Sequence, residues 1–166
     1  GMFVDARTAV SWRGPMLHRT VQQFLTDVHF GDLDVLLLDM PPGTGDVAIS
    51  VGQLMPHAEV VVVTTPQRAA ADVAERSGLV ARQTGIGVVE NMAGLAQPDG
   101  SVLELFGSGG GAETAARLEV PLLAQIPLSV RLREGGDAGE PIVLRGGAVA
   151  AEPDAAGAAI TALARD

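Results

Sequence analysis

The sequence predicts an α/β fold of three layers, in which a mostly parallel sheet carries helices on both faces. Four short apolar runs are typical of buried parallel strands, at residues 34–40, 59–65, 87–92 and 121–128. Stretches with apolar residues at helical spacing lie between these runs. Strands that alternate with helices are joined by right-handed crossovers, so they are expected to run parallel in one sheet.

Five helices are predicted around these strands. The first covers 16–28, where Leu17, Val21 and Leu25 recur at helical spacing and Pro15 suits the first turn. The others are expected at 47–55, 68–84, 112–118 and 154–165.

Two segments lack such a regular pattern. Glycine, proline and serine interrupt residues 93–111, which predicts a loop or a small hairpin, and 131–144 is expected to form a Gly-rich turn. Residues 1–166 contain no internal repeat and no linker, so a single domain is expected.

The composition excludes several kinds of chemistry. The 166-residue chain has 20 acidic and 11 basic residues, all of the latter arginine, and a formal charge of −9. Without Lys, Cys or Tyr, it has no Schiff-base lysine, thiol nucleophile, disulfide, or thiolate-bound metal or iron–sulfur cluster of its own. Its acidity and scattered arginines disfavour binding to nucleic acids and anionic membranes. No apolar run reaches the roughly 20 residues that span a bilayer, and the first residues lack a secretory pattern, so a cytoplasmic location is expected.

One stretch combines several chemically informative residues. Asp39 ends the predicted strand 34–40, and Gly43, Thr44 and Gly45 follow two prolines at its carboxyl end, where open α/β sheets bind ligands. A carboxylate there can hold a Mg²⁺-bound water, and the glycines let backbone N–H groups approach a phosphate. The alternative is a strand end and a turn that bind nothing, and the residues alone favour neither interpretation.

Two weaker features also carry alternatives. The glycine run FGSGGG at 106–111 could cradle an anion or form a flexible loop, and we favour the loop. His18, His29 and His57 are far apart and share no ligand spacing, so no metal site is assigned.

The segment DLDVLLLDMPPGTGDVAIS at 32–50 resembles the strand and switch of the Mrp (ApbC-like) family, P-loop ATPases related to MinD and implicated in carrying iron–sulfur clusters. Further similar segments follow the family order along nearly the whole chain: WRGPMLHRTVQQFL, VVVTTPQ, GVVENM, ELFGSGGG, VPLLAQIPL and GDAGEPIVL. Each is moderately specific, and the ordered set is highly specific.

The resemblance implies ATP and Mg²⁺ as ligands and roles for five residues. Asp39 matches the catalytic carboxylate that orders the Mg²⁺-bound water, and Gly43 and Thr44 match the switch that senses the γ-phosphate. Asn91 matches a residue that hydrogen-bonds the edge of adenine, and Pro127 begins a segment beside the base. For Asn91 the alternative is a polar cap that ends a strand.

The chain departs from the family pattern in two places. The family's Gly-rich loop, with its lysines, lies upstream of residue 1, so we expect the C-terminal part of the ATPase domain, a partial P-loop NTPase fold without the P-loop strand. Neither hydrolysis nor tight binding of ATP is then expected of this chain alone. Where many members carry Cys-x-x-Cys, residues 95–100 read LAQPDG, so no iron–sulfur cluster is expected on cysteines of this chain.

Two functions are consistent with the resemblance. The first is an ATP-binding fragment of an ATPase linked to iron–sulfur cluster assembly and transfer, and the alternative is a non-catalytic paralogue that acts through protein contacts. Without the P-loop strand, the strand 34–40 should leave an apolar edge that residues 2–10 or a second chain would cover. We therefore expect a homodimer, and the resemblance implies iron–sulfur assembly proteins as further partners.

Overall fold

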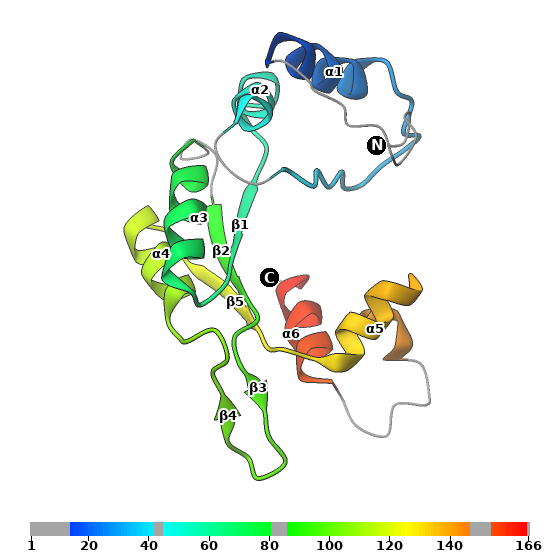
Figure 1. Cartoon of the computed structure of the whole chain (residues 1–166). Coiled ribbons are helices and arrows are strands. Elements are labelled where there is room, and N and C mark those ends of the chain that lie inside the picture. Colours follow the sequence, from blue (N-terminus) through cyan, green and yellow to red (C-terminus); the bar gives the residue numbers. More distant parts are fainter. Residues whose placement is uncertain (1–13, 42–44, 81–85, 147–153, 166) are drawn as a thin grey trace, which may run out of the picture. The chain divides into compact units, whose positions relative to one another are not determined.

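The computed structural model describes residues 14–41, 45–80, 86–146 and 154–165. Its internal contacts divide the chain into a first unit of residues 1–58 and a second unit of residues 59–166 (Figure 1). Within the described residues, no helix is long and apolar enough to cross a membrane. The single domain expected from length and composition stays a prediction.

The first unit contains two helices that contact each other, α1 (Gly14–Thr26) and α2 (Asp46–Leu54). Both were predicted, and both are confirmed. The buried hydroxyl of Ser50 donates to the Asp46 carbonyl oxygen at 2.6 Å, so it accepts from Nδ1–H of His18 at 2.9 Å. This hydrogen bond links α1 to α2.

The predicted strand at 34–40 is wrong. The segment has no strand pairing, and its side chains are exposed, up to 88% for Leu37. A strand forms only where a neighbouring strand satisfies its N–H and C=O groups, and no described segment does this for 34–40. Residues 2–10, which were expected as one cover for this segment, lie outside the described residues.

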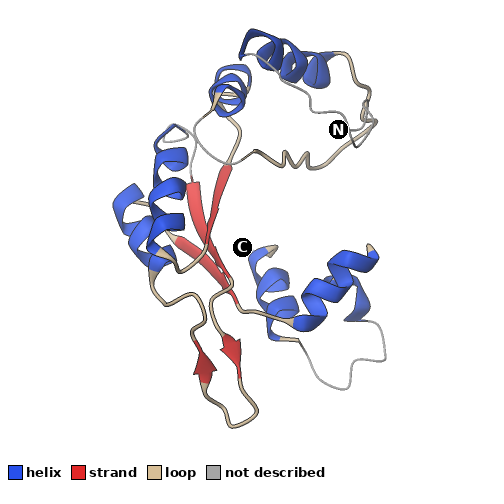
Figure 2. Ribbon diagram, viewed as in Figure 1, coloured by secondary structure: helices blue, strands red, loops and turns tan. Residues whose placement is uncertain are grey.

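The second unit is built on a parallel three-stranded sheet (Figures 1 and 2). Its strands are β1 (Val60–Thr64), β2 (Ile86–Asn91) and β5 (Leu122–Ile126), in the order β1-β2-β5. They confirm the strands predicted at 59–65, 87–92 and 121–128. β2 is the central strand, and its run of small and β-branched residues fits a strand covered on both faces.

Helices cover both faces of this sheet, which confirms the three-layer α/β class. The helices α3 (Arg68–Val80) and α4 (Gly110–Leu118) pack on one face, and α6 (Ala155–Leu163) packs on the other (Figure 1). Val88 joins the cluster on the α3 and α4 side, whereas its neighbour Val89 joins the cluster with α6. These helices confirm those predicted at 68–84, 112–118 and 154–165 as far as the described residues extend.

The irregular segment at 93–111 contains a small hairpin, as expected. Its strands, β3 (Leu95–Ala96) and β4 (Val102–Leu103), pair antiparallel. At the turn, Asp99 accepts hydrogen bonds from the backbone N–H of Ser101 at 2.9 Å and from its hydroxyl at 2.6 Å. These bonds lower the pKa of the exposed Asp99 carboxyl.

A helix stands where a Gly-rich turn was expected. The helix α5 (Val130–Ala138) begins after Ser129, whose hydroxyl oxygen accepts from the N–H of Leu132 at 3.0 Å, and it ends at Gly139, which has a φ of 69°. Gly135 is needed inside α5 because a Cβ there would lie 2.7 Å from the Glu140 carbonyl oxygen. A short 3₁₀ helix, η1 (Ile142–Gly146), follows.

Candidate functional site

The carboxyl ends of β1, β2 and β5 meet at one edge of the sheet because the three strands are parallel. Open α/β sheets bind their ligands at such an edge. Asn91, the last residue of β2, pairs in register with Ile126, the last residue of β5, and Pro127 follows directly. The structure thus brings together two of the predicted site residues, Asn91 and Pro127.

The structure does not describe the other predicted site residues together with Asn91 and Pro127. Asp39 lies in the first unit, in the exposed segment 34–40, so its expected position at the end of a paired strand is wrong. Gly43 and Thr44 lie outside the described residues.

Asn91 makes the sharp turn at the end of β2. Its Oδ1 accepts from the N–H of Met92 at 2.9 Å, and Met92 has a φ of 60°, which is uncommon for a residue with a side chain. The N–H of Ala93 then returns to the Ile126 carbonyl oxygen at 3.0 Å. Among the described residues, the Asn91 amide NH₂ has no acceptor, so this half-buried side chain caps the strand and still offers two donors.

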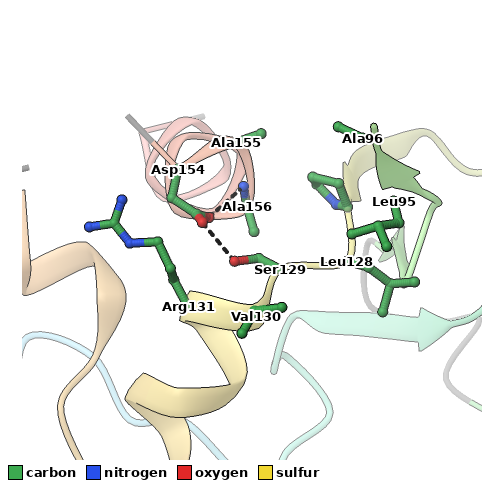
Figure 3. Close-up of a pocket in the computed structure, with 10 residues that line it drawn as sticks. Leu95, Ala96, Leu128, Ser129, Val130, Arg131, Asp154, Ala155 and Ala156 are labelled. Carbon is green, nitrogen blue, oxygen red and sulfur yellow. Dashed lines mark hydrogen bonds between the residues drawn. The ribbon is translucent and has the colours of Figure 1, made fainter. Parts of the chain in front are cut away.

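A pocket of about 270 Å³ opens beside Pro127 (Figure 3). One wall consists of residues 127–131, which leave β5 and begin α5. The opposite wall consists of residues 154–156 at the start of α6, and Leu95 and Ala96 of β3 complete the lining. The lining combines apolar and polar surface, and its polar side chains, those of Ser129, Arg131 and Asp154, lie at the two helix starts.

Ser129 and Asp154 join the two walls of this pocket. The Ser129 hydroxyl donates to Oδ2 of Asp154 at 2.6 Å, while Oδ1 of Asp154 accepts from the N–H of Ala156 at 3.0 Å (Figure 3). The same Oδ1 also accepts from the N–H of Gly157 at 3.1 Å. Burial raises the pKa of Asp154, but these hydrogen bonds and the charge of Arg131 outweigh it and hold the pKa below its ordinary value of 3.8.

A local feature of the sequence could have indicated both Ser129 and Asp154, which were not predicted as site residues. Ser and Asp are favoured immediately before a helix, where they cap free N–H groups, and Ser129 and Asp154 precede α5 and α6 in that way. That the two caps would meet is a tertiary contact, for which the local pattern gives no indication.

A buried carboxylate lies at the other side of the same sheet edge. Glu90 is 1% exposed, and its Oε2 accepts from the N–H of Gly111 at 2.5 Å while its Oε1 accepts from Nε2 of Gln125 at 2.7 Å. The last glycines of the run therefore begin α4, and the N–H of Gly111 binds the side chain of Glu90. The interpretation of 106–111 as merely flexible is wrong for its last three glycines, which lie at the start of a helix.

The model of one protein family, the NUBPL iron-transfer P-loop NTPases of the ParA group, matches residues 1–162. The chain belongs to this family. Its relatives include an iron-sulfur cluster carrier protein of Mycobacterium leprae, 62% identical over 153 residues that make up 87% of this chain and 40% of the relative. The iron-sulfur cluster carrier protein of Synechocystis is 44% identical, covering 99% of this chain and 47% of its own length. The chain thus spans less than half of these two relatives.

Solved structures resemble the NUBPL-type chain in fold. A nucleotide-binding protein from Archaeoglobus fulgidus, in complex with ADP, has a TM-score of 0.63 and 37% identity over 74% of this chain and 52% of that protein. MinD of Aquifex aeolicus has a TM-score of 0.59, and the match covers 92% of this chain and 59% of the MinD chain. The two sequences are 23% identical, so the likeness is one of fold alone. The resemblance to MinD-related P-loop ATPases is confirmed.

Proposed function

We propose that this chain carries the base-binding side of the nucleotide site of an ATPase that transfers iron–sulfur clusters. The supporting observation is the pairing of Asn91 with Ile126, which places Asn91 beside the end of β5, just before Pro127, at the ligand-binding edge of a parallel sheet. Among the described residues, the amide NH₂ of Asn91 has no acceptor. A relative in fold, from Archaeoglobus fulgidus, is bound to ADP.

Each residue of the proposed site has a chemical role. The Asn91 amide donates to a ring nitrogen of adenine, and Pro127 lies against the base. Asp39 would order a Mg²⁺-bound water, and Gly43 and Thr44 would belong to the switch that senses the γ-phosphate, once the segment 34–40 is paired as a strand. Mg²⁺ would supply charge stabilisation at the γ-phosphate, and Asp39 is an oxygen donor of the type that Mg²⁺ prefers.

The 166 residues alone are proposed to be incompetent in hydrolysis. They contain no lysine, so the β- and γ-phosphates lack the charged ligand that P-loop enzymes use. They also contain no cysteine, and the hairpin turn at 97–101 is closed instead by Asp99 and Ser101. A cluster carried by the longer protein would need ligands from outside this chain.

Calorimetry and NMR titrations test this proposal. Adenosine and Mg-ATP should bind with similar affinities, both weaker than about 1 mM, because only the base is recognised. Asn91→Ala should abolish both, whereas Gln53→Ala, which removes an exposed amide from α2, should leave them unchanged. Sub-millimolar binding of Mg-ATP, or the absence of any adenosine-induced shift around Asn91, would contradict the proposal.

A second candidate function is that of an oligomerisation module, and the exposed segment 34–40 favours it. Five of its seven residues are large apolar residues exposed to solvent, a feature that proteins normally cover (Val35, Leu36, Leu37, Leu38 and Met40). We propose a homodimer in which this segment is covered, with iron–sulfur assembly proteins as further partners.

The oligomeric state distinguishes this second candidate from a monomeric fragment. Light scattering at micromolar concentration should give twice the monomer mass, and Leu37→Asp should give the monomer mass without lowering the melting temperature of the second unit. Val143→Asp, at another exposed apolar side chain, is the control and should stay dimeric. A wild-type monomer would contradict the dimer.

A further inference from the structure

We propose that Ser129 and Asp154 are positioning residues of the nucleotide site, and that the hydrogen bond between them sets the width of the pocket that takes the adenine ring. This inference rests on the proposed function and names the determinant of base affinity within it. The pocket beside Pro127 has a wall on either side of that hydrogen bond, which is 2.6 Å long.

The hydrogen bond is well placed to control the pocket because each partner starts a helix. The Ser129 oxygen also accepts from the N–H of Leu132 in α5, and Asp154 also accepts from the N–H groups of Ala156 and Gly157 in α6. A change in the distance between Ser129 and Asp154 therefore moves the first turn of α5 or α6. These first turns are the opposite walls of the pocket.

The pocket suits a flat, uncharged ring. Its volume of about 270 Å³ lies below the range of about 300–1,000 Å³ usual for drug-sized ligands, so it fits a base better than a whole nucleotide. Leu95, Pro127, Leu128 and Val130 offer apolar surface. The charges of Asp154 and Arg131, which both line the pocket, oppose each other, so the lining offers a phosphate no net attraction.

Asp154 does not itself hydrogen-bond to the base. Its two oxygens already accept three hydrogen bonds from the protein, and Arg131 lies close enough to favour its charge. Its effect on a ligand therefore passes through the position of the wall at 154–156. Asn91 does not line the pocket, and its donors would reach the ring from the adjacent strand end, where Asn91 pairs with Ile126 just before Pro127.

Four variants separate the positioning role from helix capping. Ser129→Asp keeps a good cap on α5 but sets a second carboxylate against Asp154, which pushes the walls apart. Ser129→Asn keeps the cap and can donate to Asp154. Asp154→Ser keeps a cap on α6 but is too short to reach Ser129, and the double variant Ser129→Asp with Asp154→Ser exchanges the two partners.

The hairpin offers a matched control. The Ser101 hydroxyl donates to Oδ1 of Asp99 at 2.6 Å, the same kind of pair at the same distance, and neither residue lines the pocket. Ser101→Asp therefore introduces the same repulsion between carboxylates elsewhere in the second unit.

The affinity for adenosine is measured by NMR titration of the full chain, together with the melting temperature of each variant. Ser129→Asp should weaken adenosine binding about tenfold and Asp154→Ser several-fold, while Ser129→Asn and the exchanged pair stay within about twofold of wild type. Ser101→Asp should bind adenosine as wild type does.

The outcomes distinguish this inference from the function on which it rests. The positioning role is overturned if wild type and Ser129→Asp bind adenosine equally. It is also overturned if the affinity for adenosine falls in each variant in proportion to its melting temperature. Neither result contradicts the proposed base site. If adenosine shifts no signal of Asn91 or of residues 127–131 in wild type, the proposed base site fails, and the positioning role fails with it. If Ser129→Asp does not fold, Asp154→Ser decides the question alone.

Discussion

The backbone N–H of Gly111 donates a 2.5 Å hydrogen bond to Oε2 of Glu90, joining the start of α4 to the central strand of the sheet. The carboxylate is buried, and a helix N-terminus is a favourable place for its charge. A Cβ on residue 111 would lie 2.5 Å from Cβ of Glu90, so only glycine permits this approach.

Gly111→Ala should therefore destabilise the protein. Alanine gains about 1 kcal/mol in helix propensity over glycine. Overpacking against Glu90 costs about 1–3 kcal/mol, and the hydrogen bond is strained as well, so we expect a net loss of about 2 kcal/mol in the free energy of unfolding. Urea denaturation measures it.

Gly136→Ala is the control for Gly111→Ala. Gly136 also lies inside a helix, but a Cβ there meets nothing within 4 Å, so the substitution should stabilise the protein by about 0.5 kcal/mol. Equal effects of the two substitutions would show that the close approach at Glu90 is unimportant.

Asp154 should make stability depend on pH. Because the pKa of Asp154 is lower in the folded than in the unfolded chain, its ionised form stabilises the fold above pH 3.8, and this contribution is lost as the pH falls through the folded pKa. The difference in unfolding free energy between wild type and Asp154→Ala should thus be constant near neutrality and shrink in acid. A difference that grows in acid would contradict the hydrogen-bonded carboxylate.

Arg117 should contribute a salt-sensitive contact between α3 and α4. Its guanidinium contacts Glu75 at 2.8 Å, Glu113 at 2.5 Å and Asp72 at 3.4 Å. The hydrogen bond to Glu75 is the main cause that raises the pKa of Arg117, and the charge of Glu113 is the next. Arg117→Ala should lower the melting temperature slightly, and about 1 M NaCl should reduce the difference.

A control for Arg117→Ala is Arg133→Ala, whose ion pairs stay within α5. Its effect on melting temperature should be smaller at low salt, because no contact between helices is lost. Identical salt dependence for the two variants would argue against the role of Arg117 between helices.

The two faces of the sheet should respond differently to valine truncation. Val88 is fully buried between the sheet and α4, so Val88→Ala should cost about 2–3 kcal/mol in unfolding free energy. Val63 on β1 is 62% exposed, so Val63→Ala should stay within about 0.5 kcal/mol of wild type. Chemical denaturation of both variants compares a buried and an exposed position in neighbouring strands.

Local patterns predicted the elements that depend on local features. The apolar runs at 59–65 and 87–92 predicted β1 and β2 to within one residue at each end, so the sequence alone placed Asn91 correctly at a strand terminus. The helix α5 was missed because Gly135 and Gly136 outweighed the capping signal of Ser129.

Contacts between distant segments of the chain could not be predicted from the sequence. The run at 34–40 looks as much like a strand as 59–65 does, but a strand also needs a partner, and no described segment supplies one. Likewise, the pocket depends on Ser129 meeting Asp154, 25 residues later, and the start of α4 is joined to β2 by Glu90 meeting Gly111. Such distant contacts have no local signature.

Val88 and Val89, adjacent on β2, each belong to a different hydrophobic cluster. One strand therefore packs against both helical layers, and the loss of either layer removes the cover from one face of that strand. The second unit should lose both layers together in a single cooperative transition, so the edge at Asn91 and Pro127 would persist until that transition rather than fray ahead of it.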